Sequence, residues 1–181
     1  MKKKLLFIIV FIGLLFGILF LNLWNKDTYK IELDRELKTT LFDQYPYEQL
    51  LVFFGYVGCA DVCTPRLHEL NEIYTQIDTN KTAVVFINLA KVNDKDQPSL
   101  FAHYFNTNFY APYLEKPISD ELKSEFNVYF APSLRSETDY DHSSFVYLLK
   151  KEGNDFKLKS IYITTPLPKK EIINDLKGKK Q

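Results

Sequence analysis

An uncharged run of twenty mostly apolar residues near the N-terminus divides this chain of 181 residues into two unlike parts. The run extends from Leu5 to Trp24 and follows three consecutive lysines. A helix rises about 1.5 Å per residue, so a helix of this length spans about 30 Å, the thickness of a bilayer's hydrocarbon core. Lysines on one flank mark the cytoplasmic side. We therefore expect a cytoplasmic tail at residues 1–4 and a single transmembrane anchor at residues 5–24.

A cleaved signal peptide is the alternative for this segment. Its apolar region is about 7–15 residues long and ends at a cleavage site with small residues. The run here is longer, and residues 21–26 (LNLWNK) contain no such site, which favours an uncleaved anchor. A short, lysine-led N-terminus without an amphipathic Arg- and Ser-rich stretch is typical of bacterial rather than mitochondrial proteins. We expect a single-pass protein of the bacterial cytoplasmic (inner) membrane, with its C-terminal domain on the periplasmic, or extracytoplasmic, side.

The net charge of the whole chain is zero, from 23 basic and 23 acidic residues, and it is the sum of the charges of these two parts. Because three lysines precede the anchor, 20 basic residues face 23 acidic ones beyond it, a net charge of about −3. A nucleic-acid-binding domain shows a basic excess, so this class of partner is excluded. The two cysteines are too few for a disulfide scaffold or a four-cysteine zinc site. The only methionine is the first residue, which excludes a Met-rich metal site.

Beyond the anchor, short apolar runs alternate with segments of helical periodicity. Residues 25–40 are polar and are expected to be a linker that leads into a strand or extended segment. The expected strands are Leu50–Val57, Ala83–Leu89, Ser144–Leu149 and Phe156–Ile163. Four helices are expected. The first has Thr64 as N-cap and Pro65 as its first helical residue, and the second covers Pro98–Asn106. The third contains Ile118, Leu122 and Phe126, and the last covers Pro168–Lys177.

This order of elements resembles the thioredoxin layout, an α/β fold in which helices cover both faces of a central sheet. We expect this thioredoxin-like domain at residues 41–177 and a C-terminal tail at residues 178–181. The residues of the Pro98–Asn106 helix that are expected to face inward are Leu100, Phe101, Tyr104 and Phe105.

Both cysteines lie in the sequence GCADVCTP, between the first expected buried strand and the helix after it. Open α/β sheets bind their ligands at this kind of junction. Cys63 precedes the helix, whose positive N-terminal end favours a thiolate. Two thiols that converge from one loop form either a metal site or a reversible disulfide. A structural disulfide is disfavoured because so short a closed loop adds little stability, and three residues separate the cysteines where a thioredoxin-type motif has two.

Of the three histidines, only His142 has a position that suggests a role in such a site. It directly precedes the expected strand Ser144–Leu149, which in a thioredoxin-like sheet lies next to the strand that leads into the cysteines. His68 and His103 fall outside the apolar stripes of their helices and are expected at the surface. On position alone, His142 is a candidate metal ligand or an ordinary loop residue.

The run FFGYVGCADVCTPRL resembles the FGYT-x-CPDVCP stretch of the Sco/SenC family, and YDHSSFVYLL resembles that family's DH-S/T-x-x-x-YL segment. The two motifs lie about eighty residues apart, as in the family, whose members also typically have a single N-terminal anchor. The resemblance implies that Cys59, Cys63 and His142 bind a copper ion. This chain departs from the family in having Ala60 after the first cysteine, a proline displaced to position 65, and Asn88-Leu89-Ala90 in place of Asp-Pro.

The resemblance implies a membrane-anchored copper-binding protein that delivers copper to, or maintains the thiols of, a respiratory oxidase copper site. Its partner would be that oxidase subunit or another envelope protein with thiols or copper. A thiol–disulfide oxidoreductase that uses Cys59 and Cys63 as a redox-active pair is the alternative, and a tethered binding module with an oxidised pair is a third. A peroxidase is disfavoured because Val57-Gly58 offers the first cysteine no polar helper. Asp141 is a candidate to orient the His142 ring, or a simple turn residue.

Overall fold

The computed structural model describes residues 4, 11–17, 29–134 and 139–178 of the chain. Most of the expected anchor at 5–24 lies outside these described residues, and the part inside them, residues 11–17, is helical. Within the described ranges, no helix is both long enough and apolar enough to cross a membrane.

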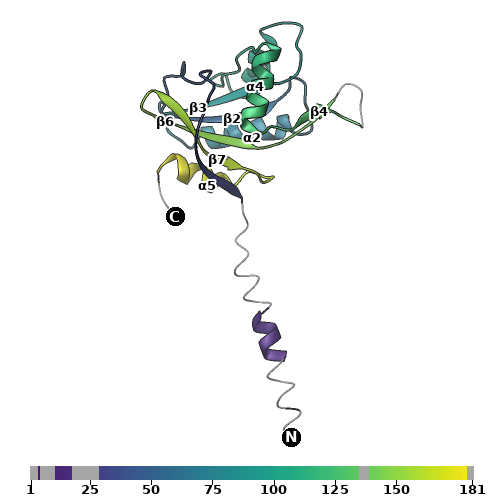
Figure 1. Ribbon diagram of the computed structural model, residues 1–181, viewed down its shortest axis with the longest axis vertical. Helices are drawn as coiled ribbons and strands as arrows, with labels where there is room; N and C mark the ends of the chain where they lie inside the picture. The colour runs from purple at the N-terminus through teal and green to yellow at the C-terminus, as the bar shows by residue number, and fades with distance from the viewer. Residues whose placement is uncertain (1–3, 5–10, 18–28, 135–138, 179–181) are drawn as a thin grey trace.

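A five-stranded sheet forms the centre of the domain, with strand order β1-β7-β6-β2-β3 (Figure 1). Its strands are β1 (Lys30–Glu36), β2 (Gln49–Gly55), β3 (Thr82–Asn88), β6 (Val146–Glu152) and β7 (Asp155–Tyr162). Strands β2 and β3 are parallel, and the other neighbouring pairs are antiparallel. Almost every residue of β2 and β3 is buried because both faces of this part of the sheet are covered, which explains their continuous apolar runs.

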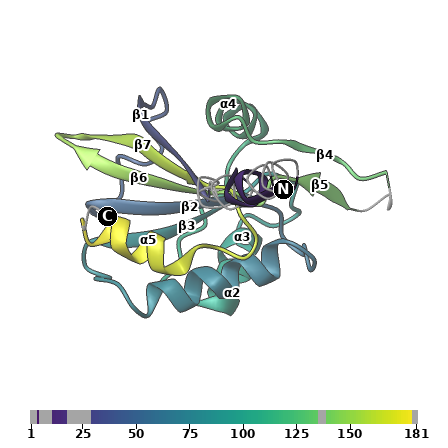
Figure 2. The same ribbon diagram turned by 90° about the horizontal axis from the view of Figure 1, so that it is seen from below.

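Helices cover both faces of the sheet, as the expected thioredoxin-like layout requires (Figure 2). Helices α2 (Cys63–Tyr74), α3 (Gln97–Phe105) and α5 (Lys169–Leu176) lie on one face, and α4 (Lys116–Phe126) lies on the other. The alternation of side chains along β2 separates two cores. Leu51 and Phe53 pack with α2, α3 and α5, whereas Leu50, Val52 and Phe54 pack with α4.

The inward face of α3 agrees only in part with the expected one, since Phe105 is buried and Phe101 packs partly buried against the core. Leu100 and Tyr104 are 65% and 81% exposed, whereas Pro98, Ala102 and Phe105 are buried. The buried residues follow the i, i+4, i+7 spacing of one helical face, and Leu100 and Tyr104 project from other sides. The helical period, and not the size of the side chains, therefore decides which residues of α3 face the core.

Helix α4 shows a similar shift of its buried face. Ile118, expected in the core with Leu122 and Phe126, is 42% exposed. Ser119 occupies the core position instead, and its hydroxyl donates a hydrogen bond to the Lys116 carbonyl at 2.8 Å. This local bond satisfies the serine hydroxyl, so a polar residue is tolerated in the buried stripe.

Three strands, β1, β4 and β5, add to the four strands whose bounds were expected from the sequence. Residues 30–36, within the range expected to be a linker leading into an extended segment, form β1 and pair with β7 at the edge of the sheet. Strands β4 (Phe130–Pro132) and β5 (Tyr140–His142) form a separate two-stranded sheet that projects beside α4 (Figure 2). Strands of three residues are too short to show a period in the sequence.

Candidate metal and thiol site

The loop that carries Cys59 begins where β2 ends. The Cys59 N–H donates to the Tyr56 carbonyl at 3.3 Å and closes a tight turn. Gly58 occupies this turn at φ +90°, a conformation that side chains disfavour. The turn places the first cysteine directly over the end of the strand.

Helix α2 begins at Cys63, two residues earlier than expected, and has no side-chain N-cap. Thr64 is therefore a helical residue rather than the N-cap. Its hydroxyl donates to the Cys59 carbonyl at 3.1 Å and ties the two ends of the cysteine loop together. Pro65 lies in the first turn, where a missing N–H costs nothing because those amides have no partner within the helix.

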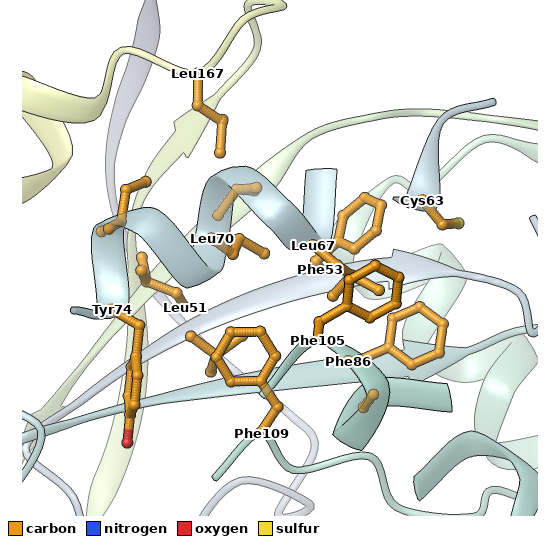
Figure 3. Close-up of a cluster of buried hydrophobic side chains, with 14 of the residues drawn as sticks. Leu51, Phe53, Cys63, Leu67, Leu70, Tyr74, Phe86, Phe105, Phe109 and Leu167 are labelled. Carbon is orange, nitrogen blue, oxygen red and sulfur yellow. The ribbon is translucent and has the colours of Figure 1, made fainter. Parts of the chain in front are cut away.

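Cys63 is fully buried at one end of the apolar cluster beneath α2 (Figure 3). The last residue of β2, Gly55, lies directly against it. A β-carbon at position 55 would be 2.4 Å from the Cys63 Sγ and 3.1 Å from the Phe86 ring. The absence of a side chain at residue 55 is therefore what makes room for the second sulfur.

His142 lies at the end of β5 and faces both cysteines. Its Nε2 is 3.5 Å from the Cys59 Sγ and 3.4 Å from the Cys63 Sγ. Its Nδ1 lies 3.0 Å from the Ser143 carbonyl, which can only accept, so Nδ1 carries the proton and Nε2 has its lone pair free. Asp141, the candidate for this orienting role, is exposed, and the Ser143 carbonyl orients the ring instead.

The tertiary fold therefore brings together all three residues that the sequence singled out. One ligand atom from each of Cys59, Cys63 and His142 lies within 4.8 Å of the others. Both cysteines are free thiols and at least nine-tenths buried, while the histidine is half-buried. His68 and His103 are exposed, as expected. Two sulfurs and one imidazole nitrogen form a compact donor set for a soft or borderline metal ion.

The two cysteines differ in acidity. A hydrogen bond from the Cys63 side chain, with others from the N–H groups of Cys63 and Val62, lowers the pKa of Cys59 well below its usual range. The Cys63 N–H lies 3.3 Å from the Cys59 Sγ. Burial, reinforced by its neighbour Cys59, raises the pKa of Cys63. The Cys63 side chain and the N–H groups at the start of α2 therefore stabilise a thiolate at Cys59 and not at Cys63, where the sequence had suggested it.

Aromatic rings enclose the histidine. Tyr56 meets the His142 ring edge-on with centroids 5.7 Å apart, and Phe53 lies 6.2 Å from it. Tyr140 contacts Tyr56 at 5.4 Å and stacks on Phe130 at 4.6 Å. The stacked rings join β4 to β5, in which Phe130 pairs with His142, and their contacts with Tyr56 hold this hairpin against the body of the domain.

Asn88, at the end of β3, is a further residue that positions the cysteine loop. Its Oδ1 accepts the Val57 N–H at 2.9 Å, and its Nδ2 donates to the Ala90 carbonyl at 2.7 Å. The side chain is buried, and the oxygen and the nitrogen of its amide both have hydrogen-bond partners within the protein. Sequence reasoning noted Asn88-Leu89-Ala90 only as a departure from a family pattern. An amide at the end of a strand beside the site was the available signal.

Arg66 fastens the other side of α2 to the segment after β7. The side chain is 2% exposed, forms an ion pair with Glu69 at 2.7 Å and donates to the Thr165 hydroxyl at 2.8 Å. Glu69 in turn accepts the Leu167 N–H at 3.2 Å. These bonds fix α2, whose first residue is Cys63, against the connection to α5.

Comparison with known proteins gives a consistent result. The model of the SCO1/SenC family matches residues 42–179. An SCO2-like protein of Rickettsia prowazekii is 28% identical over 117 residues, which cover 59% of this chain and 56% of that protein. The chain thus spans little more than half the length of this curated relative.

Solved structures show a similar fold. Apo Sco1 from Thermus thermophilus has a TM-score of 0.62 and 22% identity, over 82% of this chain and 91% of that one. Arabidopsis thaliana ScoI, a structure with copper bound, has a TM-score of 0.61 and 16% identity, over 72% of this chain and 85% of that one. At these identities, the likeness establishes the thioredoxin-like fold.

Proposed function

The chain belongs to the SCO1/SenC family, and on this premise we propose that it binds one copper ion through Cys59, Cys63 and His142 and delivers it to the copper site of a respiratory oxidase. The observation that carries the proposal is the convergence of the three ligand atoms within 4.8 Å. These atoms come from a loop, a helix start and a hairpin that are up to 83 residues apart.

The donor set suits Cu(I), which prefers thiolates and accepts imidazole. The Cys59 thiolate attracts the cation first because its pKa is already lowered. The His142 Nε2 offers a lone pair without reorientation, since the Ser143 carbonyl holds the Nδ1 proton. Cys63 releases its proton on binding, so uptake depends on pH. Three ligands leave a coordination position for a donor from the receiving protein.

Thiol–disulfide exchange is a second candidate function, and the unlike acidities of the two cysteines favour it. The Cys59 thiolate would attack one sulfur of a partner disulfide, and the other partner sulfur would leave as a thiolate. Cys63, after losing its proton, would then attack the Cys59 Sγ of the mixed disulfide. The products are a Cys59–Cys63 disulfide and a reduced partner dithiol. Oxidation of this chain balances reduction of the partner.

The location that we propose follows from residues 1–24. The lysine-led apolar run would anchor the chain in a bacterial cytoplasmic membrane, with the domain on the extracytoplasmic side. The partner would then be an oxidase copper-site subunit, or another envelope protein with thiols or copper, that is accessible from that side.

Copper stoichiometry tests the first function. We expect the reduced full-length chain, purified in mild detergent without oxygen, to bind one copper ion per chain. Cys59→Ser, Cys63→Ser and His142→Ala should each lower the affinity by at least about tenfold, since each removes one of three donors. His103→Ala, which alters an exposed histidine, is the matched control. Unchanged affinity in Cys59→Ser or His142→Ala would overturn the assignment.

Trapping of the mixed disulfide tests the second function. Cys63→Ser keeps the attacking Cys59 but removes the resolving thiol, so a mixed disulfide with the partner should accumulate in cell envelopes. Cys59→Ser serves as the control and should trap none. If Cys63→Ser never forms a mixed disulfide with any envelope protein, thiol exchange is not a function of this chain.

A further inference from the structure

A groove of about 760 Å³ lies beside the metal and thiol site. Its walls are the segment that follows β3, the first turns of α4 and the β4–β5 hairpin. A volume of this size falls within the range of sites that hold a drug-sized ligand. None of the three candidate metal ligands lines it, so the groove is a separate feature from the donor set.

Two contacts connect the groove to the site. Asn88 lines it and also holds the Val57 N–H of the cysteine loop. Tyr140 and Phe130 form another wall, and Tyr140 contacts Tyr56, whose ring lies against His142. Two rings, those of Tyr140 and Tyr56, therefore connect the groove to the histidine, so a partner that approaches the sulfurs would also contact the groove.

The charged residues of the groove are mostly basic. Lys91 follows β3, and Lys116 and Lys123 belong to α4. Asp120, the one acidic residue among the described residues that line the groove, is paired with Lys123. Within the part of the chain that the structure describes, Lys91 and Lys116 have no ion-pair partner. The chain beyond residue 24 carries a net charge of about −3, so this basic lining opposes the sign of the domain.

The floor between the lysines is apolar. Leu89, Val92 and Leu114 contribute aliphatic side chains, and Tyr113 is 41% exposed at the rim. A small inorganic anion would leave this surface uncovered. A peptide segment with an apolar side chain between carboxylates would cover the floor and face lysines from two separate segments of the chain.

We propose that this groove docks an acidic segment of the protein with which this chain exchanges copper or thiols, with an apolar or aromatic side chain of that segment on its floor. The inference rests on the proposed function, because the partner is the recipient in that exchange. Docking here positions the partner's donor atoms next to Cys59 and His142 without using either residue for binding. Recognition and chemistry are thus assigned to different residues.

Two short synthetic peptides test the docking directly. Both have a central tryptophan, which is flanked by aspartates in one and by lysines in the other. They are titrated into the ¹⁵N-labelled full-length chain in mild detergent. We expect the aspartate peptide to shift the amide resonances of Ala90, Leu114 and Tyr140, and the lysine peptide to leave them unchanged. Raising the salt concentration should weaken binding because the attraction is electrostatic.

The Lys91→Glu/Lys116→Glu variant should weaken aspartate-peptide binding by at least about tenfold, which corresponds to about 1.4 kcal/mol. Lys81→Glu/Lys170→Glu makes the same change in net charge at exposed lysines that do not line the groove, and should stay within about twofold of the unaltered chain. Equal binding of both peptides, shifts at other residues, no shift, or indifference to Lys91→Glu/Lys116→Glu would overturn the proposal.

Copper stoichiometry of the same samples separates this proposal from the proposed function. If the chain binds one copper ion but the aspartate peptide fails, only the docking proposal is overturned. If the peptide binds with the expected lysine dependence but copper does not bind, copper transport is wrong and the groove remains a peptide site.

Discussion

The α-carbon of Gly55 lies so close to Cys63 that a β-carbon on residue 55 would be 2.4 Å from the Cys63 Sγ. This contact couples the end of a central strand to the position of a sulfur. Gly55 has no side chain, and this absence is necessary for the Cys63 sulfur to occupy its place in the candidate donor set.

We therefore predict that Gly55→Ala impairs copper binding. The methyl group must displace the Cys63 sulfur or the Phe86 ring, and overpacking of this kind costs about 1–3 kcal/mol. Copper affinity, measured by competition with a chelator, should fall by at least about tenfold, while far-UV circular dichroism stays unchanged. Gly153→Ala is the control. It strains a turn at φ +67° with nothing near its β-carbon, so it should lower stability but leave affinity intact.

Asn88 should contribute to stability through both hydrogen bonds of its side-chain amide. Asn88→Asp can still accept the Val57 N–H but cannot donate to the Ala90 carbonyl, which would then face a carboxylate oxygen. We expect a loss of about 1–3 kcal/mol in the free energy of unfolding, measured with urea, and a similar loss for Asn88→Ala. Exposed Asn93→Asp should have no effect. A wild-type unfolding midpoint in Asn88→Asp would show that the bonds to Val57 and Ala90 are unimportant.

The ion pair between buried Arg66 and partly buried Glu69 should show strong coupling. Arg66→Met alone leaves the Glu69 carboxylate without its cation, which would cost about 3–5 kcal/mol at a fully buried site and costs less here because Glu69 is 16% exposed. Glu69→Gln in the same chain removes that charge and keeps an oxygen for the Leu167 N–H, so the double variant should be more stable than Arg66→Met alone. Chemical denaturation of all four proteins gives the coupling energy. Additive losses would contradict this interpretation.

Tyr162 should make stability sensitive to high pH. Burial, together with its hydrogen bond to Asp175 at 2.7 Å, raises the pKa of this phenol. Since the native pKa lies above the unfolded value of about 10, the stabilisation is complete below pH 10 and falls by about 1.4 kcal/mol per pH unit above it. Tyr162→Phe should therefore cost about 1–2 kcal/mol near pH 7 and progressively less above pH 10.

Thermal unfolding between pH 7 and 11 tests the Tyr162 prediction. The control is Tyr104→Phe, which alters a tyrosine that is 81% exposed and should follow the unaltered chain throughout. A gap between the unaltered chain and Tyr162→Phe that widens with rising pH would reverse the sign expected from the raised pKa.

Much of the fold could be predicted from local sequence. The apolar runs around Val52 and Val85 identified β2 and β3 because these strands are buried on both faces, and the central sheet with helices on both sides was confirmed. The prediction of which faces of α3 and α4 are buried was less accurate. Leu100 and Ile118 are apolar but exposed, since a short helix turns only part of its surface to the sheet. The β4–β5 hairpin is stabilised by contacts between its short strands and by aromatic stacking, neither of which local sequence records.

The residues of the candidate site could be predicted from the sequence, but the acidity of its cysteines and the orientation of its imidazole could not. Position placed Cys59 and Cys63 at a strand–helix junction, and family resemblance added His142. The acidity of the cysteines was assigned to the wrong residue, because it is the Cys59 sulfur that accepts hydrogen bonds, first from the Cys63 side chain and then from the Cys63 N–H at the start of α2. The Ser143 carbonyl, rather than Asp141, orients the imidazole because β5 places the Asp141 side chain toward solvent.

By itself, the sequence indicated the order of the main strands and helices, since hydrophobic periodicity is a property of neighbouring residues, and its motifs, through the family resemblance, indicated the three candidate donor residues. Only the tertiary structure decided that Gly55 makes room for Cys63, that Asn88 holds the cysteine loop, and that a basic groove lies beside the site. These relationships join residues from different elements. Their distances are set by how the sheet, helices and hairpin pack, which no local pattern in the chain encodes.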